Sequence, residues 1–197
     1  MTDSEDLSKF GSMKELLPCI LIFLCPLAMA FQLFYQGRIW WCGQGDSAIW
    51  SGDVISSHNS QHLFDPYMFT HILHGVLFYW IMALVFPKMT AVRRLLIVVA
   101  AESAWEVLEN TNAVIERYRA VTISLDYYGD SVANSLGDLF ACAVGFIIAQ
   151  KLKLWLSLVF FIAIELILIF WIHDSLLLNI VMLVYPVESV KEWQMNL

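Results

Sequence analysis

Long apolar runs recur from one end of the chain to the other, and they constrain the fold more than any other feature. Five segments approach the roughly 17–25 residues that a membrane-spanning helix needs, namely 16–35, 69–86, 95–108 with its flanks, 131–150 and 154–172. Only 15% of the residues are charged, against about 25% in an ordinary soluble domain. The sequence therefore predicts an all-α fold, a polytopic transmembrane helical bundle with five spans.

A shorter apolar stretch, 175–185, follows the fifth run and stops before Pro186. It is too short for a normal span, so a short sixth helix, a re-entrant segment and an interfacial helix all remain open. The first run has a signal-like start, but it continues as far as Phe34, which favours an uncleaved anchor. We expect a flexible cytoplasmic N-terminus at 1–13 and a single integral membrane domain at 14–197.

The distribution of Lys and Arg predicts the orientation. With a cytoplasmic N-terminus, seven basic residues fall inside, namely Lys9, Lys14, Lys88, Arg93, Arg94, Lys151 and Lys153. Three fall outside, namely Arg38, Arg117 and Arg119, while the side of Lys191 depends on 175–185. The two long polar connections, 36–66 and 110–129, then both face outward.

Charge and cysteine usage exclude several functions. A net charge of −7 without a basic patch predicts no nucleic-acid partner. The four cysteines include no C-x-x-C pair, so their spacing predicts neither a zinc knuckle nor a redox pair. Cys42, in WWCGQG, is the one expected to contact water, because the others fall inside apolar runs. No G-x-S-x-G, Walker loop or H-E-x-x-H occurs.

Three of the predicted spans carry a polar stripe near the outer end. The stripes are His71 with His74, then Glu102, Glu106 and Glu109, and finally Asp130, Asn134 and Asp138. Spacings of three and four place each stripe on one helix face. A charge in the membrane core costs roughly 2.5–3.5 kcal/mol, so stripes at matched depth are expected to face one another around an outward polar pocket. Further candidates are His62, Asp65, Arg117, Arg119 and Asp126 in the outer connections, and Glu165 in the fifth run.

The candidate catalytic residues are His71, His74, Glu102, Glu106, Asp130 and Asp138. His71 or His74 could act as a base, or both could join Glu102 in binding a divalent metal such as zinc. Alternatively, the imidazoles only hydrogen-bond carboxylates across the bundle. The glutamates could supply a base, or could pair with Arg117 or Arg119 beyond the helix end.

Asp130 and Asp138 lie eight residues apart, about 12 Å along a helix, so they cannot form a dyad with each other. Asp130 could equally be an N-cap or a first-turn charge that the helix dipole favours. The candidate substrate-binding residues are His62, Asp65, Arg117, Arg119 and Asn134. The two arginines suit a lipid phosphate, with interface anchoring as the alternative.

Three stretches carry a family resemblance, namely SGDVISSHNSQHLFDPYMFTHILHG (51–75), ESAWEVLEN (102–110) and IERYRAVTISLDYYGDSVANSLGD (115–138). They resemble a family of uncharacterised multi-pass inner-membrane proteins of Gram-negative bacteria. The resemblance implies a bacterial inner-membrane location and no established activity. A weaker likeness is to VanZ-like proteins, through Glu106, Arg119 and the run Asp130-x3-Asn134-x2-Gly137. Asp138 and the histidines fall outside that pattern.

These features leave three functions open. The leading interpretation is an envelope protein, in contact with membrane lipids, that binds a lipid or lipid-linked substrate or acts on it by hydrolysis or group transfer. The second is a non-enzymatic binding or assembly protein whose polar cluster holds the helices together. A transporter is third, because the cytoplasmic halves of the spans are continuously apolar.

Overall fold

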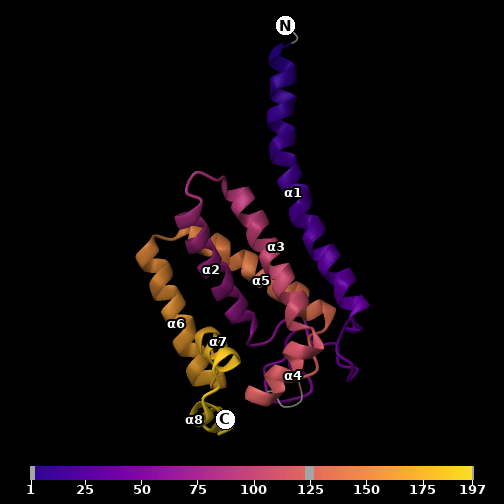
Figure 1. Cartoon of the computed structure of the whole chain (residues 1–197), viewed down its shortest axis with the longest axis vertical. Helices are drawn as coiled ribbons and strands as arrows, with labels where there is room; N and C mark the ends of the chain where they lie inside the picture. The colour runs from indigo at the N-terminus through magenta and orange to yellow at the C-terminus, as the bar shows by residue number, and fades with distance from the viewer. Residues whose placement is uncertain (1–2, 123–126, 197) are drawn as a thin grey trace.

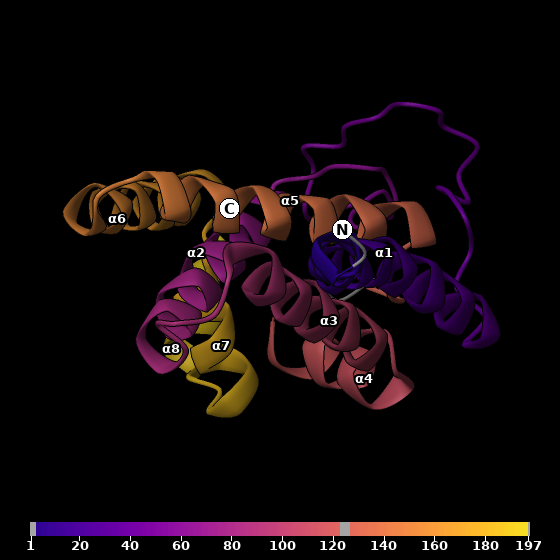
Figure 2. The same cartoon turned by 90° about the horizontal axis from the view of Figure 1, so that it is seen from above.

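The computed structural model describes the backbone of residues 3–122 and 127–196 and their side chains from Leu16 onward, so Asp126 lies outside the described residues. The described elements confirm the all-α prediction. They are α1 (Asp3–Tyr35), α2 (Met68–Val85), α3 (Ala91–Glu109), α4 (Asn112–Val121), α5 (Val132–Lys151), α6 (Leu154–Ile172), α7 (Leu176–Val184) and α8 (Glu188–Gln194) (Figure 1). Figure 2 shows α6 at one edge of the bundle and α1 at the other, with α2, α3 and α5 between them.

Four helices are long and apolar enough to cross a membrane, namely Leu16–Tyr35 within α1, Met68–Val85, Val132–Lys151 and Leu154–Ile172. The third predicted span, 95–108, forms α3, which has 19 residues but includes Arg93, Arg94, Glu102, Glu106 and Glu109. These five charges lower its hydropathy, so length and composition support four spans rather than five. Glu102 and Glu106 are buried, which shields their carboxylates from lipid.

The outer surface of the bundle is more apolar than a water-soluble protein tolerates. Phe31 of α1 is 74% exposed and Phe170 of α6 is 80% exposed, whereas Glu102 and Glu106 are fully buried. A wide apolar surface around a polar interior matches a helical bundle that has lipid as its solvent. The four apolar helices and this surface indicate a multi-pass membrane protein.

Two glycines bring α2 and α5 into backbone contact. A Cβ on Gly75 would lie 1.9 Å from the carbonyl oxygen of Cys142, and a Cβ on Gly145 would lie 1.9 Å from that of Ile72. Small residues at such crossings let membrane helices approach closely. The contact places the histidine face of α2 against the aspartate face of α5.

The two long polar connections lie at the same end of the bundle, opposite the N-terminus (Figure 1). The amide of Ser131 donates to the Ser60 carbonyl at 2.9 Å, and Gln61 Nε2 donates to the Gly129 carbonyl at 2.9 Å. The connection 36–66 therefore packs on the start of α5. The sequence predicted that the two polar connections lie on the same side, and the structure places them at the same end of the bundle. That this end faces outward, and that residues 1–13 are flexible and cytoplasmic, stay predictions.

The apolar stretch 175–185 forms α7, a helix of nine residues and about 13 Å in length, which is too short to span a bilayer. Its first turn is held by Glu165 of α6, whose two carboxylate oxygens accept from the amides of Leu176 at 3.0 Å and Leu177 at 3.3 Å. Glu165 therefore positions α7 and does not extend the polar stripes. Helix α4, which the sequence did not predict, forms within the second polar connection, 110–129. It contacts α7.

Candidate functional site

Two histidines of α2 share one carboxylate oxygen of α3. His71 Nδ1 lies 2.7 Å and His74 Nδ1 2.9 Å from Glu102 Oε1. An ionised carboxylate can only accept, so in this arrangement both Nδ1 atoms carry the proton. His71 Nδ1 also approaches Glu106 Oε1 to 3.4 Å. Two of the predicted stripes therefore face each other inside the bundle.

The third stripe, on α5, completes the arrangement. Asp138 Oδ2 lies 3.9 Å from His71 Nε2, so one imidazole ring is flanked by carboxylates from α3 and α5. We call His71, His74, Glu102, Glu106 and Asp138 the polar cluster. Its burial in an apolar bundle confirms the predicted meeting of the stripes, while the catalytic roles of its members stay predictions.

Asp130 lies beside the polar cluster and is held by its own hydrogen bonds. It accepts from Asn110 Nδ2 at 2.8 Å and from the Tyr127 hydroxyl at 3.0 Å, and its amide donates to Asn110 Oδ1 at 2.7 Å. Burial raises the pKa of the Asp130 carboxyl, and these hydrogen bonds partly oppose the rise. The alternative that Asp130 caps α5 is wrong, because the cap is Ser131, whose hydroxyl accepts from the Asn134 amide at 3.1 Å.

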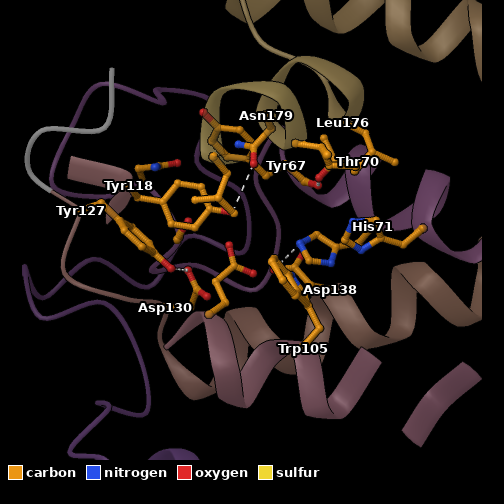
Figure 3. A pocket seen from close by; sticks show the side chains of 16 residues that line it. Tyr67, Thr70, His71, Trp105, Tyr118, Tyr127, Asp130, Asp138, Leu176 and Asn179 are labelled. Carbon is orange, nitrogen blue, oxygen red and sulfur yellow. Dashed lines mark hydrogen bonds and ion pairs between the residues drawn. The ribbon is translucent and has the colours of Figure 1, made fainter. Parts of the chain in front are cut away.

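A cavity of about 80 Å³ opens between the polar cluster and α7. One side carries His71, His74, Asp138, Asp130 and Glu109, and the other carries Asn179 and the apolar Leu176, Ile180 and Leu183 of α7. Figure 3 shows His71 directed at Asp138 and Tyr127 directed at Asp130, with Leu176 and Asn179 across the cavity. The volume has room for several waters or one small polar group.

Several carboxylate oxygens in the polar cluster have no hydrogen-bond donor among the described residues. They are Glu102 Oε2, both oxygens of Glu106, and Asp138 Oδ1. Buried carboxylates this close repel one another strongly in a low-dielectric interior when some of their oxygens lack a donor. The cluster must therefore hold additional protons or a cation.

A divalent metal fits the donor types of the polar cluster. One set of mutually close donors is His71, His74 and Glu102, and another is His71, Glu106 and Asp138. Two imidazoles with one carboxylate is a donor set that zinc uses in catalytic sites. Ligands of tetrahedral zinc lie about 3.3 Å apart, from bonds of about 2.05 Å. The 2.7 and 2.9 Å contacts to Glu102 would therefore have to open by about half an ångström.

The candidate substrate-binding residues His62, Asp65 and Asn134 form hydrogen bonds with the backbone of the connection 36–66. None of the three lines the cavity. Asp65 accepts from the amides of Ser60 at 3.0 Å and Tyr67 at 2.7 Å, and burial raises its pKa to about 6. Asn134 Nδ2 donates to the His62 carbonyl at 2.9 Å. His62, Asp65 and Asn134 therefore fix the loop to α5, and a direct contact of these three with a substrate stays a prediction.

The two arginines bind backbone carbonyls. Arg117 donates through Nε and Nη2 to the Leu183 carbonyl at 3.1 and 3.0 Å, which closes the last turn of α7. Arg119 donates through Nε to the Tyr127 carbonyl. Neither lines the cavity and, within the described segments, neither pairs with a glutamate. The geometry favours anchoring, and the role of Arg117 and Arg119 in binding a phosphate stays a prediction.

Several cavity residues escaped the sequence interpretation. The cavity lining includes five residues that were not among the predicted site residues, namely Asn59, Trp105, Tyr118, Tyr127 and Asn179. The tyrosine three residues before Asp130 was the one available clue, since a loop hydroxyl so close to a buried carboxylate has few other acceptors.

The fold and the polar cluster together define a class, a multi-pass helical membrane protein with a buried histidine–carboxylate cluster. A family model described as "Protein of unknown function (DUF2585)" matches residues 33–196. A UPF0314 protein of Paracoccus denitrificans is 45% identical over 172 residues, covering 87% of this chain and 89% of the relative. The chain belongs to this DUF2585/UPF0314 family.

Other relatives agree with this assignment. A UPF0314 protein of Brucella anthropi is 43% identical over 178 residues, covering 90% of each chain. One of Rhizobium meliloti is 46% identical over 176 residues, covering 88% of this chain and 89% of the relative. No solved structure matches the chain. The resemblance to uncharacterised bacterial proteins is confirmed, whereas the comparisons do not support the likeness to VanZ-like proteins.

Proposed function

We propose that this protein is an integral protein of the bacterial inner membrane whose cavity binds a lipid or lipid-linked substrate and acts on it by hydrolysis or group transfer. The observation that carries the proposal is the two-sided lining of the cavity, where His71, Asp130 and Asp138 face a wall of α7 that is apolar apart from Asn179. A lipid offers the matching combination of a polar headgroup and acyl chains. Convergent polar groups in a largely apolar pocket are typical of ligand sites.

The hydrogen bonds suggest how the chemistry is divided. Glu102 accepts the Nδ1 proton of His71 and so leaves Nε2 able to take a proton, as in other oriented histidine bases. Nε2 takes the proton of an attacking water or hydroxyl, whose oxygen bonds to the phosphorus or carbonyl carbon of the substrate. Asp138 stabilises the resulting imidazolium, and Asp130 supplies the proton that the leaving oxygen takes up.

Topology supports access from the outer side. We propose that α3 is a fifth crossing, shielded from lipid by α1, α2 and α5, which it contacts, and that the N-terminus is cytoplasmic. Lys191 donates to the Ala120 carbonyl at 2.7 Å and so joins the cavity end. The basic residues then number seven inside and four outside, which favours this orientation.

Lipid turnover tests the proposal. Full-length protein is reconstituted into liposomes of total inner-membrane lipid from a Gram-negative bacterium, and lipids and released headgroups are followed by mass spectrometry. We expect the wild type to convert at least one lipid, and His71→Gln and Asp138→Asn to abolish conversion. The control is His173→Asn, because His173 stacks on Trp193 away from the cavity, and Asn tolerates its positive φ.

The same preparations separate the alternatives. If the wild type converts no lipid and retains none through purification, while His71→Gln and Asp138→Asn unfold more readily than the control, the polar cluster only joins helices and the proposal is wrong. Bound metal is measured in parallel. If His71→Gln and Glu102→Gln each hold one equivalent of metal less than the wild type, the polar cluster binds a cation. If their metal content is unchanged, the charge of the polar cluster is balanced by protons.

Orientation is tested by labelling with a membrane-impermeant maleimide. Asp53→Cys places an exposed thiol in 36–66, and Lys88→Cys places one in the turn between α2 and α3 at the opposite end. In intact spheroplasts we expect labelling at position 53 only, above the wild-type background from native cysteines. Labelling at 88 instead would reverse the topology.

A further inference from the structure

A second cluster of metal-binding side chains lies within the connection 36–66, apart from the cavity. Cys42 Sγ lies 3.4 Å from His58 Nδ1, and that nitrogen lies 3.2 Å from His62 Nε2. Cys42 was expected to contact water, but it is 7% exposed, because the loop folds over it. We call Cys42, Asp46, His58 and His62 the loop cluster.

Asp46 completes the loop cluster on its open side. Its Oδ2 lies 4.0 Å from His58 Nδ1 and 3.9 Å from His62 Nε2. Its other oxygen accepts from the Ala48 amide at 2.8 Å, which turns Oδ2 toward the imidazoles. The donor atoms of Cys42, His58 and His62 therefore lie within 4.8 Å of one another, and the Asp46 carboxylate approaches both imidazoles from the open side.

The tautomer of His62 is set by a backbone carbonyl. Its Nδ1 lies 2.6 Å from the oxygen of Ala48, and because a carbonyl can only accept, Nδ1 carries the proton. The lone pair of Nε2 then points into the loop cluster. Metal-binding histidines are usually oriented in this way, with the second ring nitrogen bonded to a carbonyl or carboxylate. His62 is fully buried, so its direction is rigidly held.

Two of the separations in the loop cluster match zinc. Bonds of about 2.05 Å to nitrogen and about 2.3 Å to sulfur place two nitrogens about 3.3 Å apart, and nitrogen and sulfur about 3.6 Å apart, in a tetrahedron. The loop cluster has 3.2 Å and 3.4 Å for these pairs, while the 4.0 and 3.9 Å contacts of Asp46 Oδ2 would have to close by about 0.6 Å. We propose that Cys42, His58 and His62, with Asp46 as fourth ligand, bind a zinc ion. Four protein ligands leave no open position, which is typical of a structural site.

The position of the loop cluster suggests what the ion does. His58 and His62 flank Asn59 and Ser60, which line the cavity. Ser60 has a φ of 58°, a left-handed conformation that is uncommon for a residue other than glycine. A zinc ion that ties His58 to His62 would hold this turn, and with it one wall of the cavity. The zinc site does not depend on the chemistry proposed for the polar cluster.

Metal content and cobalt spectroscopy test the site. Full-length wild type, Cys42→Ser and the control Cys142→Ala are purified, and zinc per chain is measured. Cys142 is the matched control, because it is a buried cysteine in α5. The chelator-treated proteins are then titrated with Co²⁺, because a cobalt–thiolate bond produces a charge-transfer band in the near ultraviolet.

We expect Cys42→Ser to hold one zinc fewer than the wild type and Cys142→Ala to hold the same amount. The cobalt band should saturate at one equivalent in the wild type, Cys142→Ala and His71→Gln, and should be absent from Cys42→Ser. Equal zinc in the wild type and Cys42→Ser, or no thiolate band in the wild type, would overturn the proposal. The wild-type titration does not depend on how well any variant folds.

Discussion

Replacing Gly145 by alanine tests the close contact between α2 and α5. The added Cβ would meet the Ile72 carbonyl oxygen at 1.9 Å and its carbonyl carbon at 2.8 Å, whereas ordinary carbon–oxygen contacts are about 3.3 Å or longer. The two helices must therefore separate by about 1.4 Å. Both obstacles are backbone atoms, so no side-chain rotation relieves them.

The expected loss can be worked out from two opposing effects. Overpacking of this kind costs about 1–3 kcal/mol, and alanine gains about 1 kcal/mol over glycine in a helix interior. Because the oxygen lies so far inside the contact distance, we expect the upper part of the range and a net loss of about 1–2 kcal/mol in unfolding free energy. Separation also moves His71 away from Asp138, so lipid turnover should fall.

The assay is SDS titration of the purified protein in mixed micelles, followed by tryptophan fluorescence. Gly75→Ala should behave alike, and the double variant should lose less than the sum, because one separation relieves both clashes. Gly43→Ala is the control, because its Cβ would meet only Ile39 Cδ1 at 3.4 Å; we expect a change within about 0.5 kcal/mol. A Gly145→Ala protein as stable as the wild type would refute the contact.

Three further predictions follow from residues that hold α7, each measured by the same unfolding assay. Arg117→Ala should lose about 1.5–3 kcal/mol by removing the charged donors to the Leu183 carbonyl, and Arg117→Lys should recover part of it; an unchanged stability would favour the phosphate role. Glu165→Leu removes the acceptor of the first amides of α7 and should lower the unfolding free energy by about 1–2 kcal/mol. An unchanged unfolding free energy would argue against a stabilising role of these hydrogen bonds. Burial raises the pKa of Asp174 from 3.8 to about 6 in the folded protein. The contribution of this carboxyl to the unfolding free energy is therefore fully present below pH 3.8 and is lost as the pH rises through about 6. Asp174→Asn should flatten the decline between these pH values, and an equally steep decline would contradict the shift.

Sequence periodicity located most of the structure that contacts lipid. Runs of about 20 apolar residues leave a chain few alternatives to a spanning helix. Apart from the start of α1, the helices α1, α2, α5 and α6 begin and end within a few residues of the predicted runs. Length and composition support four of the five predicted spans and leave α3 a proposed crossing, because its five charges depend on neighbouring helices for shelter. Helix α4 was missed because it is short and polar and is stabilised by tertiary contacts.

The candidate site was predictable as far as helical spacing extends. Side chains three and four residues apart share a face, so the stripes of α2, α3 and α5 could be read directly and the structure brings them together. Spacing says nothing about which loop folds over which helix. Arg117, Arg119, His62 and Asp65 were therefore recognised as polar residues of interest, but their contacts with backbone carbonyls and amides were not foreseen.

The sequence by itself determined that the chain is a bundle of membrane helices and that its polar residues form stripes, because both follow from local periodicity and from the cost of polar groups in lipid. Tertiary structure alone decided which atoms meet. The shared oxygen of Glu102, the apolar wall that α7 sets against the polar cluster, and the convergence of Cys42 with His58 and His62 all join residues distant in sequence. Such pairings depend on how the helices cross and the loops fold, for which one chain's local pattern carries no information.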